Sequence, residues 1–208
     1  MLRANFYIDG YNLYCGLKQA GLYPFIWLNL DWLCRLLVER ARETLSSVTY
    51  FTALPEHDPG KAERHRVFLS ALRAAAPSLE IVLGDFKTTT RRCSQCGREF
   101  RHWEEKRTDV AIAVRVTADA FEDRFDCAYL MSADSDLVPA ISTLKGRFPS
   151  KKIGAWFPPG RHSNDIRKSS DFASTIPDRL VRRCQLPDPV TLPDGRLILK
   201  PDKWRIKR

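Results

Sequence analysis

The sequence predicts an α/β protein whose central, mostly parallel sheet is covered by helices on both faces. Short segments rich in β-branched, aromatic and aliphatic residues recur along the chain, and segments with apolar side chains at helical spacing separate them. Strands that alternate with helices are typical of parallel sheets. The chain has 208 residues, of which 44% are hydrophobic, so it can bury the core of one domain that carries an appendage.

The expected strands are short, and β-branched and aromatic residues are common in them. They comprise residues 4–8, 48–54, 79–86, 126–131 and 152–157. The expected helices comprise residues 30–42, 60–75, 109–121, a segment from Asp136 to about residue 146, and a short helix in SNDIRKSS. The sequence SADSD before the fourth of these helices supplies acidic and hydroxyl side chains, which suit a helix start.

Three segments interrupt the alternation. Residues 87–107 are polar and strongly charged, which indicates an insertion. Residues 158–171 are rich in Pro, Gly and Ser and form a loop. From Leu186 onward, four prolines and a DG turn signal allow at most a short hairpin or an extended arm. We therefore expect one domain over residues 1–180, which contains the insertion, and a basic extension over residues 181–208.

The charge balance favours an anionic partner. Lys and Arg total 34 against 25 Asp and Glu, a net charge of +9, and such a surplus is typical of proteins that bind nucleic acid. The sequence shows no apolar run of membrane-spanning length and no secretory signal at its N-terminus. Its six cysteines have irregular spacing, which indicates reduced thiols. These features predict a soluble cytoplasmic protein.

Four aspartates are expected to meet at one edge of the sheet. Asp9 ends the first strand, and Asp134 and Asp136 follow the fourth. Asp109 begins a helix that, in a parallel arrangement, starts near the same edge. Binding sites of open parallel sheets form where the carboxyl ends of the strands meet. The topology alone therefore brings these four carboxylates toward one pocket.

Clustered carboxylates raise one another's pKa, and a divalent cation relieves that repulsion. Oxygen ligands without nearby His or Cys suit a hard ion, so Mg²⁺ or Mn²⁺ is the expected cofactor. Such an ion lowers the pKa of a bound water and offsets the charge that develops during phosphodiester hydrolysis. Asn12, Ser132 and Ser135 are candidates to orient waters or the scissile phosphate. The alternative for each aspartate is a turn former or a helix cap, and Asp136 is the strongest candidate for an N-cap.

Four motifs resemble, in order, those of a known family. FYIDGYNLY, EKRTDVAIAV, YLMSADSDLVPAI and FPPGRHSNDIRKSSDFA are similar to the motifs of NYN domains, in particular the LabA-like (DUF88) branch of the PIN-like nuclease superfamily. The resemblance spans residues 5 to about 176 and implies a PIN-like α/β/α sandwich with metal-dependent ribonuclease activity. It implies an acidic site formed by Asp9, Asp109, Asp134 and Asp136, with Asn12 beside them.

Three positions differ from the family pattern or extend it. In SADSD, Ala133 stands where relatives usually have Gly. Arg115 stands where many relatives have Asp, and we expect it to place a cation near the cleft. Asp171 matches a further acidic position of the family, either at the margin of the site or as a helix cap, and we favour the cap.

The insertion carries a candidate zinc site. Cys93-Ser-Gln-Cys96 followed by Gly has the form of a zinc knuckle, and His102 is the nearest further ligand. Because a structural zinc needs four ligands, His57 or His162 from a distance, a water or a second subunit would have to complete the site. The alternative is a pair of free thiols on a hairpin.

Basic and aromatic residues interleave in the insertion. Basic side chains bind phosphates and aromatic faces such as those of Phe100 and Trp103 accept unstacked bases, so the segment suits single-stranded RNA. The alternative is a surface hairpin whose aromatic side chains pack on the body. The basic tail from Arg196 either extends the phosphate-binding surface or belongs to an arm that docks through Trp204.

The loop after the fifth predicted strand offers contacts to a substrate phosphate, because that strand should end at the same edge as Asp9. The candidates are Arg161, His162, Arg167 and Lys168. Together the predictions describe a metal-dependent endoribonuclease. The alternative is a noncatalytic RNA-binding or regulatory module that retains the acidic cluster, and either protein could form a homo-oligomer.

Overall fold

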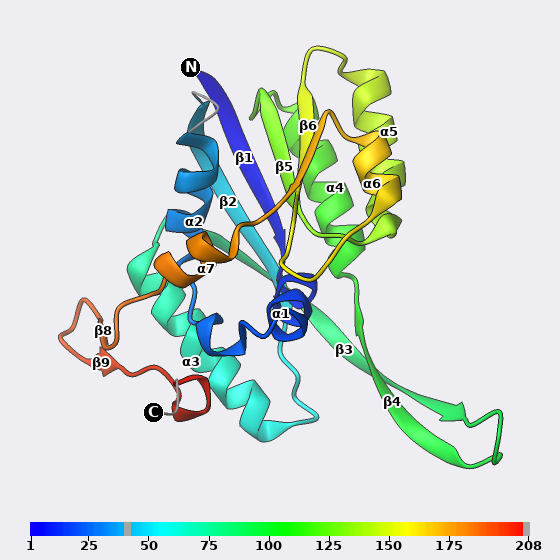
Figure 1. Cartoon of the computed structure of the whole chain (residues 1–208), viewed down its shortest axis with the longest axis vertical. Coiled ribbons are helices and arrows are strands. Elements are labelled where there is room, and N and C mark those ends of the chain that lie inside the picture. Colours follow the sequence, from blue (N-terminus) through cyan, green and yellow to red (C-terminus); the bar gives the residue numbers. More distant parts are fainter. Residues whose placement is uncertain (40–42, 206–208) are drawn as a thin grey trace.

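The computed structural model describes residues 1–39 and 43–205, apart from the side chains of His102 and Glu104, and it confirms the α/β fold class. Seven strands of this part of the chain form one sheet in the order β4-β3-β2-β1-β5-β6-β7 (Figure 1). Neighbouring strands are parallel except β3 and β4, which form an antiparallel hairpin. The sheet lies between helices, consistent with a PIN-like α/β/α sandwich.

The strands of the main sheet are β1 (Leu2–Asp9), β2 (Glu43–Ala53), β3 (Glu80–Arg92), β4 (Glu99–Lys106), β5 (Cys127–Met131), β6 (Lys152–Phe157) and β7 (Phe172–Thr175). The α-helices are α1 (Gly10–Gln19), α2 (Leu30–Val38), α3 (Pro59–Ala75), α4 (Thr108–Phe121), α5 (Val138–Arg147), α6 (Asn164–Ser169) and α7 (Asp178–Arg183). Short 3₁₀ turns are η1 (Tyr23–Phe25), η3 (Ser135–Leu137) and η4 (Asp202–Trp204). No helix in the described part of the chain is both long and apolar enough to cross a membrane.

The predicted elements are present with altered bounds. The five predicted strands correspond to β1, β2, β3, β5 and β6, and the insertion forms the hairpin of β3 and β4. The predicted helix over residues 30–42 corresponds to α2, and its last positions, 40–42, lie outside the described residues. The sequence analysis missed α1, β7 and α7.

Two hydrophobic cores cover the two faces of the sheet. Phe6 and Ile8 of β1 belong to the core that packs against α1, α2, α3 and α7. Tyr7 belongs to the opposite core, with side chains of α4, α5 and α6. Because side chains alternate along a strand, Asp9 follows Tyr7 on the α4 face. The core pattern of β1 therefore decides which helices the first aspartate meets.

Gly10 lets α1 start directly beneath the sheet. A Cβ built on this residue would lie 2.7 Å from the Phe51 carbonyl oxygen and 2.7 Å from the Tyr50 ring. Any larger residue at this position would therefore require β2 to move. Asp9 is the N-cap of the same helix, so the position of the glycine also fixes the position of the carboxylate.

We expect Gly10→Ala to destabilise the protein by about 1–3 kcal/mol, because overpacking outweighs the roughly 1 kcal/mol that Ala gains over Gly in a helix. Gly146→Ala in α5 is the matched control, since its added Cβ meets nothing within 4 Å. That variant should be stabilised by up to about 1 kcal/mol. Urea denaturation of both variants measures the difference, and equal stability of the two would contradict the steric argument.

The C-terminal segment returns to the body of the protein. Two short antiparallel strands, β8 (Val190–Thr191) and β9 (Leu197–Ile198), form the hairpin that the turn signal allowed. Beyond them Trp204 is 7% exposed and packs near Trp27 and Phe68. The tail is therefore docked through its tryptophan, the second of the two alternatives considered for it.

Candidate active site

Asp9 lies at the carboxyl end of β1, between β2 and β5. It is 4% exposed. Its Oδ1 accepts the backbone N–H of Asn12 at 2.9 Å, and its Oδ2 accepts the Ser132 hydroxyl at 2.8 Å. The carboxylate thus caps α1 with one oxygen and fixes the β5 loop with the other. Capping and a site role, the two alternatives for Asp9, are compatible because each carboxylate oxygen can accept a second interaction.

Ser132 and Asn12 join the two loops that carry the aspartates. The Ser132 hydroxyl oxygen also accepts the N–H of Asp134 at 3.1 Å, and the Asn12 side-chain oxygen accepts the N–H of Ala133 at 3.2 Å. Both Ser132 and Asn12 are buried. These hydrogen bonds hold the SADSD loop against the start of α1, so Asp9 and Asp134 have fixed relative positions.

Asp134, and not Asp136, is the helix cap in this loop. Its Oδ1 accepts the N–H of Asp136 at 3.0 Å, at the start of η3. The helix α5 that follows begins without a side-chain cap. The expectation that Asp136 would be the N-cap is therefore wrong: the short 3₁₀ turn moves the cap two residues earlier. Asp136 and Ser135 are exposed at the surface of the loop.

Asp109 lies in the first turn of α4, which begins after Arg107, a residue with φ of 78°. This left-handed residue turns the chain from β4 into the helix. The Thr108 hydroxyl donates to the carboxylate of Glu105 across the same turn. Glu105 therefore stands next to the start of α4, beside Asp109.

Burial and the charges of neighbouring acids raise the pKa of three carboxyl groups at this edge of the sheet. Burial raises the pKa of Asp9 to about 6, and the charges of Asp109 and Asp134 add to the effect. Burial also raises the pKa of Asp109, and the charges of Asp134 and Asp136 contribute. The pKa of Glu105 rises to about 7, first through burial and then through the charges of Asp9 and Asp109.

Glu105 is a fifth acid at this edge that the sequence analysis did not identify. It lies within the strongly charged insertion over residues 87–107. Its position four residues before Asp109 is the feature of the sequence that indicates a place near the site. In the structure it lies near the end of β4, which pairs with β3.

The donor set fits a hard divalent cation. Every group is an oxygen donor, and the raised pKa values of Asp9 and Asp109 come from burial and, beyond it, from a repulsion between carboxylates that a cation would relieve. Among the described residues, no three His, Cys, Asp or Glu side chains are already close enough to enclose an ion. Oxygen donors are the ligands that Mg²⁺ takes from proteins, and it usually uses one or two carboxylates and keeps several waters.

The phosphate-contact candidates lie along the loop after β6. Arg161 packs against Gly16 of α1, where an added Cβ would meet its Cγ at 3.0 Å, and its charge reaches Tyr11. His162 is exposed and hydrogen-bonds the Asn164 side chain at 2.7 Å. The Arg167 guanidinium lies 5.6 Å from the ring centroid of Phe157, the last residue of β6. Lys168 is exposed in the last turn of α6.

Two further expectations were wrong. Arg115 lies away from the cleft, since it pairs with Glu80 at 2.7 Å and Asp119 at 3.1 Å near the amino ends of the strands. Asp171 neither borders the site nor caps a helix. It accepts the N–H of Ile153 at the beginning of β6 and pairs with Lys145 at 2.9 Å. Both side chains therefore form ion pairs at the end of the sheet where the strands begin, opposite the end that carries Asp9.

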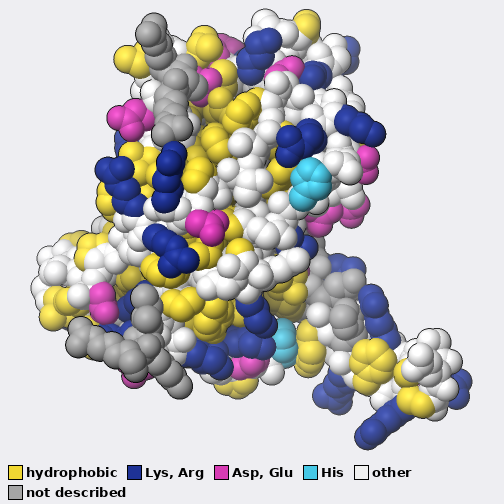
Figure 2. All heavy atoms as spheres, in the orientation of Figure 1, with side chains coloured by type: hydrophobic (Ala, Val, Ile, Leu, Met, Phe, Trp, Pro, Cys, Tyr) yellow, Lys and Arg dark blue, Asp and Glu magenta, His cyan; other side chains and the backbone are white. Residues whose placement is uncertain are grey.

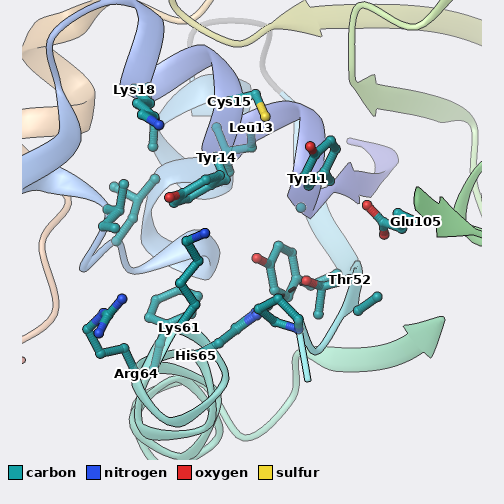
Figure 3. Close-up of a pocket in the computed structure, with 18 of the residues that line it drawn as sticks. Tyr11, Leu13, Tyr14, Cys15, Lys18, Thr52, Lys61, Arg64, His65 and Glu105 are labelled. Atoms are coloured by element: carbon teal, nitrogen blue, oxygen red, sulfur yellow. Dashed lines mark hydrogen bonds between the residues drawn. The ribbon is translucent and has the colours of Figure 1, made fainter. Parts of the chain in front are cut away.

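An aromatic pocket of about 320 Å³ opens next to the acids. Its wall includes Gly10, Tyr11, Tyr14, Tyr50, His57, His65, Phe86, Trp103, Glu105 and Trp204. Figure 3 shows Lys18, Lys61 and Arg64 toward one end and Tyr11 with Glu105 toward the other. The pocket is therefore apolar in its walls and cationic at one end. At the other end Glu105 connects it to the acidic edge, the edge of the sheet where Asp9, Asp109 and Asp134 lie.

His65 in the wall of this pocket gives the fold a pH dependence. Its ring hydrogen-bonds the Thr52 hydroxyl at 3.2 Å, and burial lowers its pKa to about 4. Because the unfolded value is about 6.5, this group stabilises the fold above that pH and the contribution is lost as pH falls toward 4. Between pH 7.5 and 5 the loss is about 2 kcal/mol. Urea denaturation should show that His65→Leu loses less stability over this range than the parent chain, and equal losses would contradict the assignment.

The hairpin of β3 and β4 carries the remaining candidates. Lys and Arg side chains lie along it where it leaves the body (Figure 2). Trp103 stacks on His57 with ring centroids 4.6 Å apart, whereas Phe100 is 48% exposed. Cys93 and Cys96 are free thiols at the tip. The side chain of His102 lies outside the described residues, and His57 and His162 are engaged elsewhere.

Comparison with known proteins gives three findings. Residues 3–176 match the NYN domain. The chain is 26% identical over 248 residues to 6-hydroxy-3-succinoylpyridine 3-monooxygenase HspA of Pseudomonas putida. The matched region covers 98% of this chain and 75% of that protein. It also resembles the crystal structure of a protein of unknown function from Vibrio parahaemolyticus, with a TM-score of 0.53, 19% identity, and coverage of 85% of this chain and 94% of that one. The last likeness supports the fold alone.

Proposed function

The chain belongs to the NYN domain family, and from this premise we propose that it is a metal-dependent endoribonuclease acting on single-stranded RNA. The observation that supports the proposal is the position of Asp9, Asp109 and Asp134 at one edge of the sheet, where burial and the charge of Asp134 raise the pKa of both Asp9 and Asp109. The proposal includes membership of the LabA-like branch of the family, which the resemblance of the SADSD and FYIDGYNLY motifs supports.

In this proposal Asp9, Asp109 and Asp134 hold Mg²⁺ or Mn²⁺, and Asp136 contributes directly or through water. The ion would supply a bound water of lowered pKa and neutralise charge on the phosphate. Asn12 and Ser132 keep the two acidic loops in register, since each bonds to the backbone of residues 133–134. Glu105 adds a further oxygen donor beside Asp109.

Substrate would enter between two cationic regions. Arg161, His162, Arg167 and Lys168 line one side, with Ser135 at the loop surface. On the other side, the aromatic pocket would accept a base removed from its stack, and Lys18, Lys61 or Arg64 would contact the adjoining phosphate. A duplex cannot present such a base, so the pocket favours single-stranded substrate.

A metal-titrated cleavage assay tests the proposal. The purified chain is incubated with mixed-sequence RNA and DNA, in linear and circular forms, with increasing Mn²⁺ or Mg²⁺ and then with excess chelator. We expect cleavage of circular RNA that appears with metal and stops with chelator. RNA binding without cleavage at any metal concentration would instead favour the noncatalytic module.

A second candidate function is oxidation of a small aromatic acid. The relative from Pseudomonas putida is named as a monooxygenase of such a compound, and the aromatic pocket with cations at one end has the matching chemistry. A monooxygenase inserts one atom of O₂ into its substrate and reduces the other to water with two electrons from a reductant. Incubation with 6-hydroxy-3-succinoylpyridine, O₂ and a reduced nicotinamide, followed by mass spectrometry, would detect an oxidised product only if this candidate holds.

A further inference from the structure

The hairpin of β3 and β4 presents a small loop far from the body of the protein. Its ladder runs from Asp85 paired with Lys106 to Arg92 paired with Glu99, about 23 Å at the usual rise per residue. Residues 93–98 connect the strands, and Ser94, Gln95 and Cys96 are exposed. Figure 1 shows the hairpin projecting outward, so the tip can be approached without contact to the sheet.

The loop at the tip has the internal hydrogen bonds of a preformed metal knuckle. The backbone N–H groups of Gln95 and Cys96 and the side chain of Cys96 interact with the Cys93 thiol. The Gly97 N–H donates to the Cys93 carbonyl at 2.9 Å. Gly97 has φ of +68°, which favours glycine. The chain is thus folded so that two sulfurs lie side by side, as chelation of one ion requires.

The same chain does not supply the remaining ligands of a zinc ion at this tip, as far as the described residues go. The backbone of His102 is four residues along β4 from Arg98, which pairs with Cys93. The backbone separation is about 13 Å, whereas zinc–ligand bonds are about 2.0–2.3 Å long. His57 lies still farther from the tip. It stacks on Trp103, which pairs with Thr88 of β3, and Thr88 is five residues before Cys93.

We propose that one Zn²⁺ joins the hairpin tips of two copies of this chain, with Cys93 and Cys96 of each copy as its four ligands. Four thiolates satisfy the tetrahedral preference of structural zinc. They also leave the site with a net charge of −2, which the guanidinium groups near the tip, including Arg92 and Arg98, offset. Without zinc these like-charged tips repel, so the association depends on the metal.

The experiment uses the full chain, reduced and freed of metal by a chelator, and then titrated with Zn²⁺. We expect binding to saturate at one zinc per two chains while light scattering shows the mass doubling from monomer to dimer. Addition of a stronger zinc chelator should restore the monomer. Co²⁺ in place of Zn²⁺ should give the visible absorption of a tetrahedral thiolate site at the same stoichiometry.

Four variants make the test specific. Cys93→Ser and Cys96→Ser each remove a ligand from an exposed loop, so they should remain folded by circular dichroism and lose the zinc-dependent dimer. Cys15→Ser, which alters another incompletely buried thiol, should dimerise as the parent does. Asp134→Asn should also dimerise, because the proposal does not depend on catalytic activity.

Other outcomes would overturn the proposal. One zinc per chain on a monomer would show that the ligands come from within the chain or from water. No zinc uptake by the reduced protein would leave a pair of free thiols. A zinc-dependent dimer that persists in both cysteine variants would locate the metal on a different surface.

Discussion

Asp134→Asn is expected to lower metal-dependent RNA cleavage about a hundred- to a thousandfold while leaving the fold intact. The substitution removes one negative charge from the acidic edge, and stabilisation of phosphoryl charge by a bound ion is worth several kcal/mol. Each 1.36 kcal/mol corresponds to about tenfold in rate. The assay is single-turnover cleavage of labelled RNA at saturating Mn²⁺.

The fold should survive because asparagine keeps the local hydrogen bond. Asp134 is only partly buried, and its Oδ1 accepts the N–H of Asp136 as the cap of η3. The side-chain oxygen of Asn can accept the same bond, and Asn is among the preferred N-caps. A loss of activity can then be assigned to the missing charge.

Asp178→Asn is the matched control. It makes the same exchange in the first turn of a helix, at an exposed position on α7 away from the acidic edge. Its cleavage rate should equal that of the parent. Full activity of the Asp134 variant, with unchanged dependence on metal, would remove Asp134 from the proposed site.

The acidic edge was predictable from the sequence because it depends on topology. Parallel strands bring their carboxyl ends together, so aspartates after β1 and β5 become neighbours whatever the details of packing. The register confirms this, since Ile8 pairs with Met131 and each strand then continues into its acidic loop.

Features that depend on three-dimensional packing were not predictable in the same way. The helix α1 contains Gly10 and Gly16, which weaken its helical pattern, yet both are required by close contacts with β2 and with the loop after β6. Glu105 looked like one charge among many in the insertion. The aromatic pocket combines α1, α3, the base of the hairpin and Trp204 from the tail, and no local pattern records that assembly.

Trp204→Ala is expected to destabilise the protein by about 3–5 kcal/mol, the usual cost of deleting a buried tryptophan side chain. The indole ring centroid lies 6.3 Å from that of Trp27 and 6.4 Å from that of Phe68, and its N–H donates to the Tyr23 hydroxyl at 3.3 Å. Thermal denaturation should show a fall in Tm of roughly 10 °C, because a domain of this size loses about 2–4 °C per kcal/mol.

Two controls separate packing from the charge of the tail. Lys203→Ala alters the exposed neighbour and should change stability by less than about 0.5 kcal/mol. Trp204→Phe keeps an aromatic ring in the core and should recover most of the lost stability. If Trp204→Ala lost less than about 1 kcal/mol, the tail would be a peripheral arm. A large loss instead makes the tail part of the folding unit and a structural wall of the pocket beside the acidic edge.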